Sequence, residues 1–235
     1  MDRQILTKLN ALRRARQAVI LVTDLSGGPD RLIVEGDAVD GLLADATASA
    51  LRSGKSSAVD IDGRNLFLNV HLPPPHIVVI GAVHISQVFA QMAVLAGFDI
   101  RIIDPRTAFA TPERFEGVDL VADWPVDALK ERPLDAYTAL VAVTHDPKID
   151  DFPIAEALKV GCFYVGALGS RKTHASRLER LTREGLTEGD LARIHAPIGL
   201  PIGASSPAEI AVSILAEIIG ALRGRNVLSP KGDKT

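Results

Sequence analysis

The sequence predicts an α/β protein in which a small N-terminal α/β domain precedes a Rossmann-like, doubly wound parallel sheet. Strand-like and helical patterns alternate regularly after residue 75, a mixed pattern with a hairpin occupies residues 1–72, and a Pro-Pro-Pro triplet separates the two regions. Because parallel neighbours need crossover connections, the regular strand–helix order favours a parallel sheet covered on both faces.

The N-terminal region has the patterns of two helices, two strands and a hairpin. The helices are expected at residues 6–16 and 38–54, the strands at 18–24 and 31–35, and the hairpin at 56–72, where Asp62-Gly63 is the turn signal. The prolines at 73–75 fix their own dihedral angles and cannot continue a ladder. We therefore expect one domain at residues 1–72 and a second at residues 76–226.

The C-terminal region alternates strands with helices. Strands are expected at 76–81, 99–104, 138–145 and 162–169, and helices at 86–98, 127–132, 153–161, 170–185 and 205–224. The last helix has Ser206 as N-cap, Pro207 at the first helical position and Glu209 placed to complete a capping box. Residues 229–235 are expected to be frayed.

Composition excludes several functional classes. With 47% hydrophobic and 23% charged residues among 235, the chain has ordinary globular composition, and its net charge of −3 argues against a nucleic-acid binder acting through bulk positive charge. Cys162 is the single cysteine, which excludes an internal disulfide and points to the cytoplasm. The uncharged stretch 77–98 contains a glycine turn and polar residues, so we expect a strand and a helix there and no membrane segment.

The first candidate ligand loop follows the strand at 76–81. Gly81 can form a tight turn before a helix start, where free N–H groups favour an anion, and His84 stands in the same loop. Val83 occupies the place where a dinucleotide fingerprint has its second glycine, so as such a fingerprint the loop is weak.

The next two strands end in titratable residues. Asp104 could accept ribose hydroxyls or could form an Asx turn, and Arg106 could contact a phosphate or only solvate a face. His145 is a candidate general base or donor to a bound ring, whereas capping of a helix by Asp146 or Asp150 is the alternative that we favour for the aspartates.

The fourth strand leads into the sharpest local charge of the chain. Gly166 and Gly169 free the backbone, Ser170 can cap the next helix, and Arg171 and Lys172 stand in its first turn. Cations at a helix N-terminus are unfavourable unless an anion compensates them. Residues 170–183 carry five basic side chains against Glu179, a net charge of +4, which indicates an anion site or, alternatively, a solvated basic face.

A last candidate loop contains Gly199 and Gly203, where a ligand could touch the backbone before the helix at 205–224. The histidines are scattered without metal-ligand spacing, so we expect no metal site. No Gly-x-Ser-x-Gly elbow indicates a nucleophile, and Cys162 is expected to be a small buried hydrophobe; we therefore expect no catalytic residues.

Together these segments resemble the XdhC/CoxI family of accessory factors for molybdenum hydroxylases. The matching stretches are "PPPHIVVIGAVHISQVFAQMAVLAGFDIRIIDPR", "AVTHD", "YVGALGSRKTHASRLERL" and "HAPIGLPIGASSPAEIAVSILAEI". The resemblance implies a Rossmann-like C-terminal domain that binds the molybdenum cofactor, protects it during sulfur insertion and delivers it to an apo-hydroxylase such as xanthine or carbon monoxide dehydrogenase. A sulfurtransferase could be a further partner, and the chain could form a homodimer, although the sequence does not fix the oligomeric state.

Two departures from the family pattern bear on this expectation. Members usually have Gly-Ala-Gly-His where this chain has Gly81-Ala82-Val83-His84, and a common Gly-Cys segment is here Gly41-Leu42-Leu43. The first hypothesis is therefore a cofactor-binding maturation factor without turnover of its own. The second is an NAD(P)-dependent oxidoreductase, which Val83 disfavours, and the third is a scaffold with a vestigial cleft.

Overall fold

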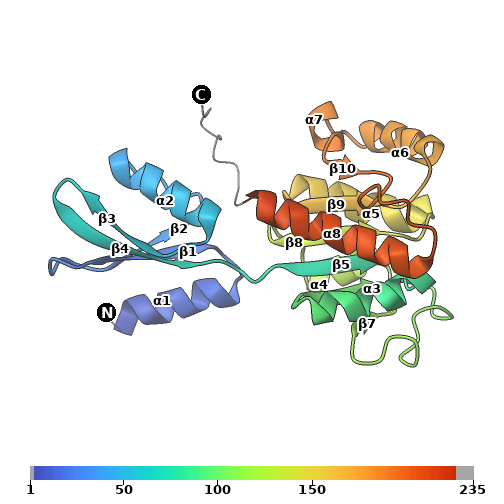
Figure 1. The fold of residues 1–235 in the computed structure, drawn as a ribbon, viewed down its shortest axis with the longest axis horizontal. Coiled ribbons are helices and arrows are strands. Elements are labelled where there is room, and N and C mark those ends of the chain that lie inside the picture. The colour runs from blue at the N-terminus through green and yellow to red at the C-terminus, as the bar shows by residue number, and fades with distance from the viewer. Residues whose placement is uncertain (1–2, 226–235) are drawn as a thin grey trace. The chain divides into compact units, whose positions relative to one another are not determined.

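The computed structural model describes residues 3–225, which divide into two compact units: the second is Pro75–Leu222, and the first contains the residues up to Pro74 together with residues 223–225 at the end of the last helix. The first unit contains α1 (Arg3–Arg14), β1 (Val19–Asp24), β2 (Arg31–Val34), α2 (Gly41–Ser53), β3 (Ser57–Ile61) and β4 (Arg64–His71). Its four strands form an antiparallel sheet in the order β2-β1-β4-β3 (Figure 1). The expected mixture of helices, strands and a hairpin is confirmed.

Alternation along β1 places one helix on each face of this sheet. Ile20 and Val22 pack in a cluster with residues of α2, whereas Val19 and Leu21 pack with Leu9 of α1. Successive side chains of a strand point to opposite faces, so both faces of β1 are apolar and both are covered. The turn expected at Asp62-Gly63 joins β3 to β4, with positive φ at both residues.

The second unit, Pro75–Leu222, holds a six-stranded, fully parallel sheet. Its strands are β5 (His76–Ile80), β6 (Asp99–Ile103), β7 (Asp119–Val121), β8 (Thr138–Ala142), β9 (Tyr164–Ala167) and β10 (Ile194–His195). Its helices are α3 (His84–Leu95), α4 (Pro125–Glu131), α5 (Pro147–Lys159), α6 (Arg171–Arg183), α7 (Glu188–Leu191) and α8 (Pro207–Arg225).

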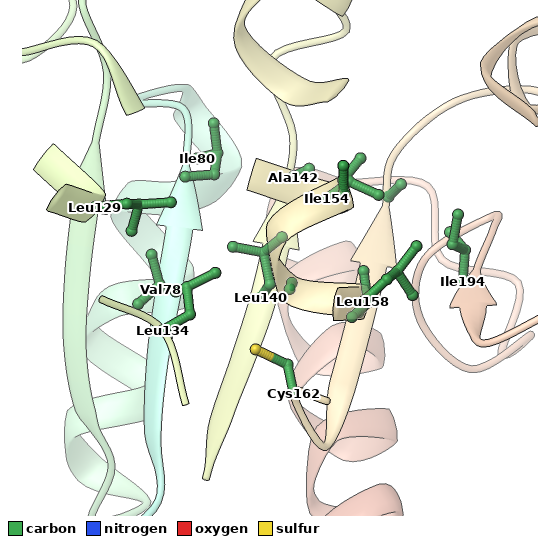
Figure 2. Close-up of a cluster of buried hydrophobic side chains, with 14 of the residues drawn as sticks. Val78, Ile80, Leu129, Leu134, Leu140, Ala142, Ile154, Leu158, Cys162 and Ile194 are labelled. Atoms are coloured by element: carbon green, nitrogen blue, oxygen red, sulfur yellow. The ribbon is translucent and has the colours of Figure 1, made fainter. Parts of the chain in front are cut away.

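The strand order is β10-β9-β8-β5-β6-β7, which is the Rossmann order in which the sequence direction reverses between β5 and β8. One core, containing Val78 and Ile80, packs against α4 and α5 (Figure 2), and the opposite core, containing Ile77 and Val79, packs against α3 and α8. The sheet is thus covered on both faces, as predicted. Cys162 is buried in the first of these cores, in line with the expectation that it is a small hydrophobe.

Four strands were expected and six are observed. β7 and β10 have three and two residues, too short to show an alternating pattern, and they are recognisable only through their pairing with β6 and β9.

The start expected for α5 is wrong. We expected Pro153 to begin it, but the helix begins at Pro147 after the N-cap Asp146 and contains Pro153 in its interior.

Candidate functional site

The candidate site is expected near the point where the strand order reverses, between β5 and β8, because ligands of doubly wound sheets bind beyond the carboxyl ends of the strands at such a point. The structure brings the Gly81–His84 segment and Thr144–Asp146 to this edge, since β5 and β8 are hydrogen-bonded neighbours in parallel register. His84 is the first residue of α3 and is exposed, and His145 follows β8 and is also exposed.

The first residues of the loop after β5 are hydrogen-bonded to the end of β6 and to the residue that follows it. The Gly81 N–H donates to the Ile103 carbonyl (2.8 Å), and the Ala82 N–H donates to Oδ2 of Asp104 (2.7 Å). Gly81 has φ 120°, and a Cβ there would lie 2.8 Å from Cγ2 of Thr144. Gly81 is therefore required for close backbone packing, and the N–H groups of Gly81 and Ala82 are engaged within the protein.

The Asp104 carboxylate, fully buried at the end of β6, is saturated with protein donors. Beside Ala82 N–H, it accepts the backbone N–H of Arg106 (2.9 Å) and a bidentate pair from the Arg106 guanidinium (2.9 and 2.7 Å). Burial raises the pKa of Asp104, but the hydrogen bonds from Arg106 and Ala82 outweigh it, and the pKa is lowered. The hydrogen bond from Arg106 N to Asp104 forms the Asx turn that was the alternative to ribose binding. No lone pair of the carboxylate remains for ribose hydroxyls.

His145 has an unusual backbone conformation that a buried aspartate holds. Its φ is 64°, which is uncommon outside glycine, and its N–H donates to Oδ2 of Asp150 (3.1 Å). The Thr144 hydroxyl donates to the other Asp150 oxygen (2.7 Å), and burial raises the pKa of Asp150 to about 6.

Asp146 caps α5 by accepting from Lys148 N (2.9 Å), so the capping interpretation of Asp146 is confirmed.

A cavity of about 260 Å³ separates the loop between β8 and α5 from α6. His145 lies on one side of it and α6 on the other, and the α6 residues that line it are Lys172, Thr173, Ser176, Arg177 and Arg180. Residues three and four apart on a helix share a face, so this spacing places all five on one side of α6. Ser170 caps α6 by accepting from Thr173 N (3.2 Å), as predicted.

The structure divides the basic cluster of α6 that the sequence presented as one group. Lys172, Arg177 and Arg180 line the cavity, whereas Arg171 and Arg183 are exposed and do not line it. Arg177 is 2% exposed and donates to the Leu168 carbonyl at the end of β9 (3.1 Å). The sequence pattern alone could not identify Arg177 as the buried one, because all five cations of this helix belong to residue types that usually lie at the surface.

The candidate glycines have different surroundings. A Cβ at Gly166 would lie 2.6 Å from Cδ1 of Ile198, and one at Gly199 would overlap the Ser213 hydroxyl, so both positions serve close packing. Gly169 precedes the N-cap of α6 with φ 142°, and Gly203 has φ 76° with open space at its Cβ position.

The loop after β10 is anchored by a group of hydrogen-bonded side chains that the sequence did not predict. The Glu217 carboxylate accepts from the Tyr164 hydroxyl (2.6 Å) and the Gly199 N–H (2.8 Å) and pairs with Nδ1 of His195 (3.0 Å). Burial, with Glu217 adding to it, raises the pKa of Tyr164. The three side chains are far apart in the chain, so no local motif signals their contact.

Residues 3–225 contain neither a metal-binding cluster nor a membrane-spanning helix. His, Cys, Asp and Glu side chains form no group of three suited to a metal ion in this part of the chain. Its helices include none with the length and apolar character needed to cross a membrane.

Comparison with curated proteins finds relatives that match between 57% and 76% of this chain. The chain is 34% identical over 184 residues (76% of this chain, 32% of the relative) to an uncharacterised protein, YqeB, of Escherichia coli (strain K12). It is 33% identical over 156 residues (66% and 45%) to a protein of Bacillus subtilis (strain 168) named as a probable xanthine dehydrogenase component. It is 29% identical over 134 residues (57% and 36%) to the molybdenum cofactor insertion chaperone PaoD of E. coli (strain K12). The chain thus spans less than half the length of these relatives.

A crystal structure described as a xanthine dehydrogenase from Bacillus halodurans has the same fold, with a TM-score of 0.62 and 22% identity, over 97% of this chain and 67% of that one. The family model of the XdhC Rossmann domain matches residues 77–218, which include every strand of the parallel sheet except the first residue of β5. By this match the chain belongs to the XdhC family.

Proposed function

We propose that the protein is a maturation factor for molybdenum hydroxylases that binds the molybdenum cofactor and delivers it to an apo-hydroxylase without turnover of its own. Membership of the XdhC family supports this role, as does similarity to a relative named as a molybdenum cofactor insertion chaperone. The observation that carries the proposal is the cationic cavity beside the carboxyl end of β8.

The donor set of this cavity fits the cofactor. Molybdopterin is an anionic ring compound that carries a phosphate, and Arg177 presents buried N–H groups that lack a hydrogen-bond partner among the described residues. When bound, the cofactor supplies the molybdenum chemistry of the hydroxylase that receives it. This chain's residues bind and shield it, and the predicted partners are the apo-hydroxylase and a sulfurtransferase.

A nicotinamide-dependent oxidoreductase is the weaker candidate. A dinucleotide needs free N–H groups and room after the first strand, but Gly81 and Ala82 donate to the protein itself and Val83 stands where the second glycine would be. Asp104 has no lone pair left for ribose hydroxyls. The geometry therefore favours a ligand placed toward β8, β9 and α6.

A binding experiment tests the proposed function. Purified protein is incubated separately with molybdopterin, NADH and NADPH, passed through a desalting column and assayed for retained ligand by pterin or nicotinamide fluorescence. We expect molybdopterin alone to be retained, and the loaded protein to restore activity to an apo-hydroxylase. Retention of a nicotinamide dinucleotide without the pterin would refute the proposal.

The exposed Arg171 tests how far the ligand extends. If the cofactor reaches beyond the cavity along the first turn of α6, Arg171→Ala weakens molybdopterin binding several-fold while the fold is retained. An unchanged affinity would remove Arg171 from the predicted contacts and confine the ligand to the residues that line the cavity.

A further inference from the structure

We propose that the cavity between α6 and His145 is a binding site for a tetrahedral oxyanion, with Arg177 and Lys172 as charged donors and Thr173 and Ser176 as hydroxyl donors. In the maturation role, on which this assignment of the ligand rests, the oxyanion is the phosphate of the molybdenum cofactor. A free phosphate or molybdate ion offers the same chemistry, and competition between these ligands separates the sources.

The buried guanidinium of Arg177 is the first observation. Its Nε and Nη1 atoms are buried and have no hydrogen-bond partner within residues 3–225, although the side chain lines the cavity. Leaving buried charged donors unpaired costs more than a typical hydrogen bond contributes, so such groups usually have a partner. An oxyanion in the cavity accepts from these donors and removes that cost.

Nearby carboxylates do not satisfy Arg177. Asp151 is engaged by Arg180, which donates to it from Nε and Nη2, and Asp151 lies 4.0 Å from Nε of Arg177, beyond hydrogen-bond distance. Asp150 directs its two oxygens to the Thr144 hydroxyl and the His145 N–H. Neither carboxylate is therefore a hydrogen-bond partner of Nε or Nη1 of Arg177, and these donors remain for an oxyanion, with which they would form charge-assisted hydrogen bonds.

The remaining lining residues complete an anion site. Lys172 lies in the first turn of α6, where the helix dipole disfavours a cation unless an anion is near, and Thr173 and Ser176 provide hydroxyls on the same face. Because lysine and arginine side chains carry charge at neutral pH, the α6 side of the cavity is cationic.

The size of the cavity limits what it holds. Sites for drug-sized ligands usually have about 300–1,000 Å³, and this cavity has about 260 Å³. It is large enough for a phosphate group and too small for a pterin ring with its substituents. The phosphate of the cofactor is thus inside the cavity and the ring extends out of it.

Calorimetric titration of the full-length protein with inorganic phosphate, and separately with molybdate, tests the site. We expect phosphate to bind the wild type, Lys172→Gln to weaken binding about tenfold, and Arg177→Lys, which retains the charge but loses the N–H groups of the guanidinium, to weaken it further. Arg183→Gln is the matched control, because Arg183 lies on α6 outside the cavity and this variant should bind like the wild type. Lys172 is exposed, so its variant tests the site even if Arg177→Lys fails to fold.

A second arm measures competition between phosphate and molybdopterin. If phosphate displaces the pterin, and both variants weaken pterin and phosphate alike, the phosphate of the cofactor is the ligand. If phosphate or molybdate binds with the same variant dependence but the pterin does not, the oxyanion site stands with a free ion as its source, and the proposed maturation role fails. If the pterin binds while phosphate and molybdate give no heat and neither variant changes its affinity, the site is refuted and the maturation role stands.

Discussion

At the scale of single residues, the loop after β8 is held in place by hydrogen bonds between neighbouring polar groups. Asp150 joins the Thr144 hydroxyl to the His145 N–H and so keeps His145 at a positive φ beside the cavity. Asp150 is 1% exposed, and burial is the main cause of its raised pKa of about 6. The Asp150 carboxyl therefore ionises near neutral pH, and its ionisation makes the free energy of unfolding depend on pH.

Replacement of Asp150 tests this linkage. A carboxyl whose pKa is raised in the folded state contributes stability fully below its ordinary pKa of 3.8 and loses it as pH rises through about 6. At about 1.4 kcal/mol per pH unit, this gives a change of about 3 kcal/mol. The free energy of unfolding of the wild type relative to Asp150→Asn should fall by about that amount between about pH 3 and 7 in urea titrations. A difference that stays constant over this range would contradict the prediction.

Gly81 tests the close packing between the ends of β5 and β8. We expect Gly81→Ala to lower the free energy of unfolding by about 2–4 kcal/mol, because the new Cβ meets Thr144 and the backbone conformation disfavours a side chain. Gly203→Ala is the matched control: it has a positive φ but open space, and should cost only about 1 kcal/mol. Equal losses in the two variants would show that packing against Thr144 contributes nothing.

At the scale of elements, side-chain caps mark the starts of α5, α6, α7 and α8. The predicted capping box of α8 is confirmed: Ser206 Oγ accepts from Glu209 N (3.2 Å) and the Glu209 carboxylate accepts from Ser206 N (2.9 Å). Hydrogen bonds from Ser206 and Ser205 lower the pKa of Glu209 to about 2. The Glu209 carboxylate therefore stays ionised, and the box complete, from mildly acidic pH upward.

Loss of this cap should weaken the fold measurably. Ser206→Ala removes the acceptor for Glu209 N and is expected to lower the free energy of unfolding by about 1 kcal/mol, measured by urea titration. Ser57, exposed at the start of β3, provides the control Ser57→Ala, which should change it by less than about 0.5 kcal/mol. A Ser206 variant as stable as the control would show that the cap does not limit α8.

At the scale of the whole molecule, the parallel sheet has its own core on both faces. The two apolar clusters that enclose it consist entirely of residues between Ile77 and Leu222, so this unit does not depend on the first for its burial. We propose that it is an autonomous domain, in agreement with the boundary expected at the proline triplet.

Expression of residues 75–225 alone tests this proposal. We expect a single cooperative thermal transition and the same affinity for inorganic phosphate as the full-length protein, because the α6 cavity lies within this segment. A non-cooperative transition, with the full-length protein unfolding cooperatively, would show that the unit needs the rest of the chain.

The sequence by itself determined the features that neighbouring residues encode. Regular alternation predicted the doubly wound parallel sheet, and Ser170, Ser206 and Asp146 were identified as caps because each acts on a backbone group within a few residues. The short strands β7 and β10 escaped this reasoning, since only pairing with distant strands defines them. The early start of α5 escaped it because a proline favoured at helix starts lies here inside a helix.

Only the tertiary structure decided which polar groups are available to a ligand. Asp104 and Ala82 are 22 residues apart and still bond, and Arg180 and Asp151 meet across 29 residues, because the register of the sheet and the packing of α5 against α6 bring them together. Burial likewise separates Arg177, which lines the cavity and has two buried donors without a hydrogen-bond partner among residues 3–225, from Arg171 and Arg183 on the surface of the same helix. Burial and long-range contact depend on the whole fold, which is the physical reason that local sequence patterns located the basic helix and Lys172 but not the burial of Arg177.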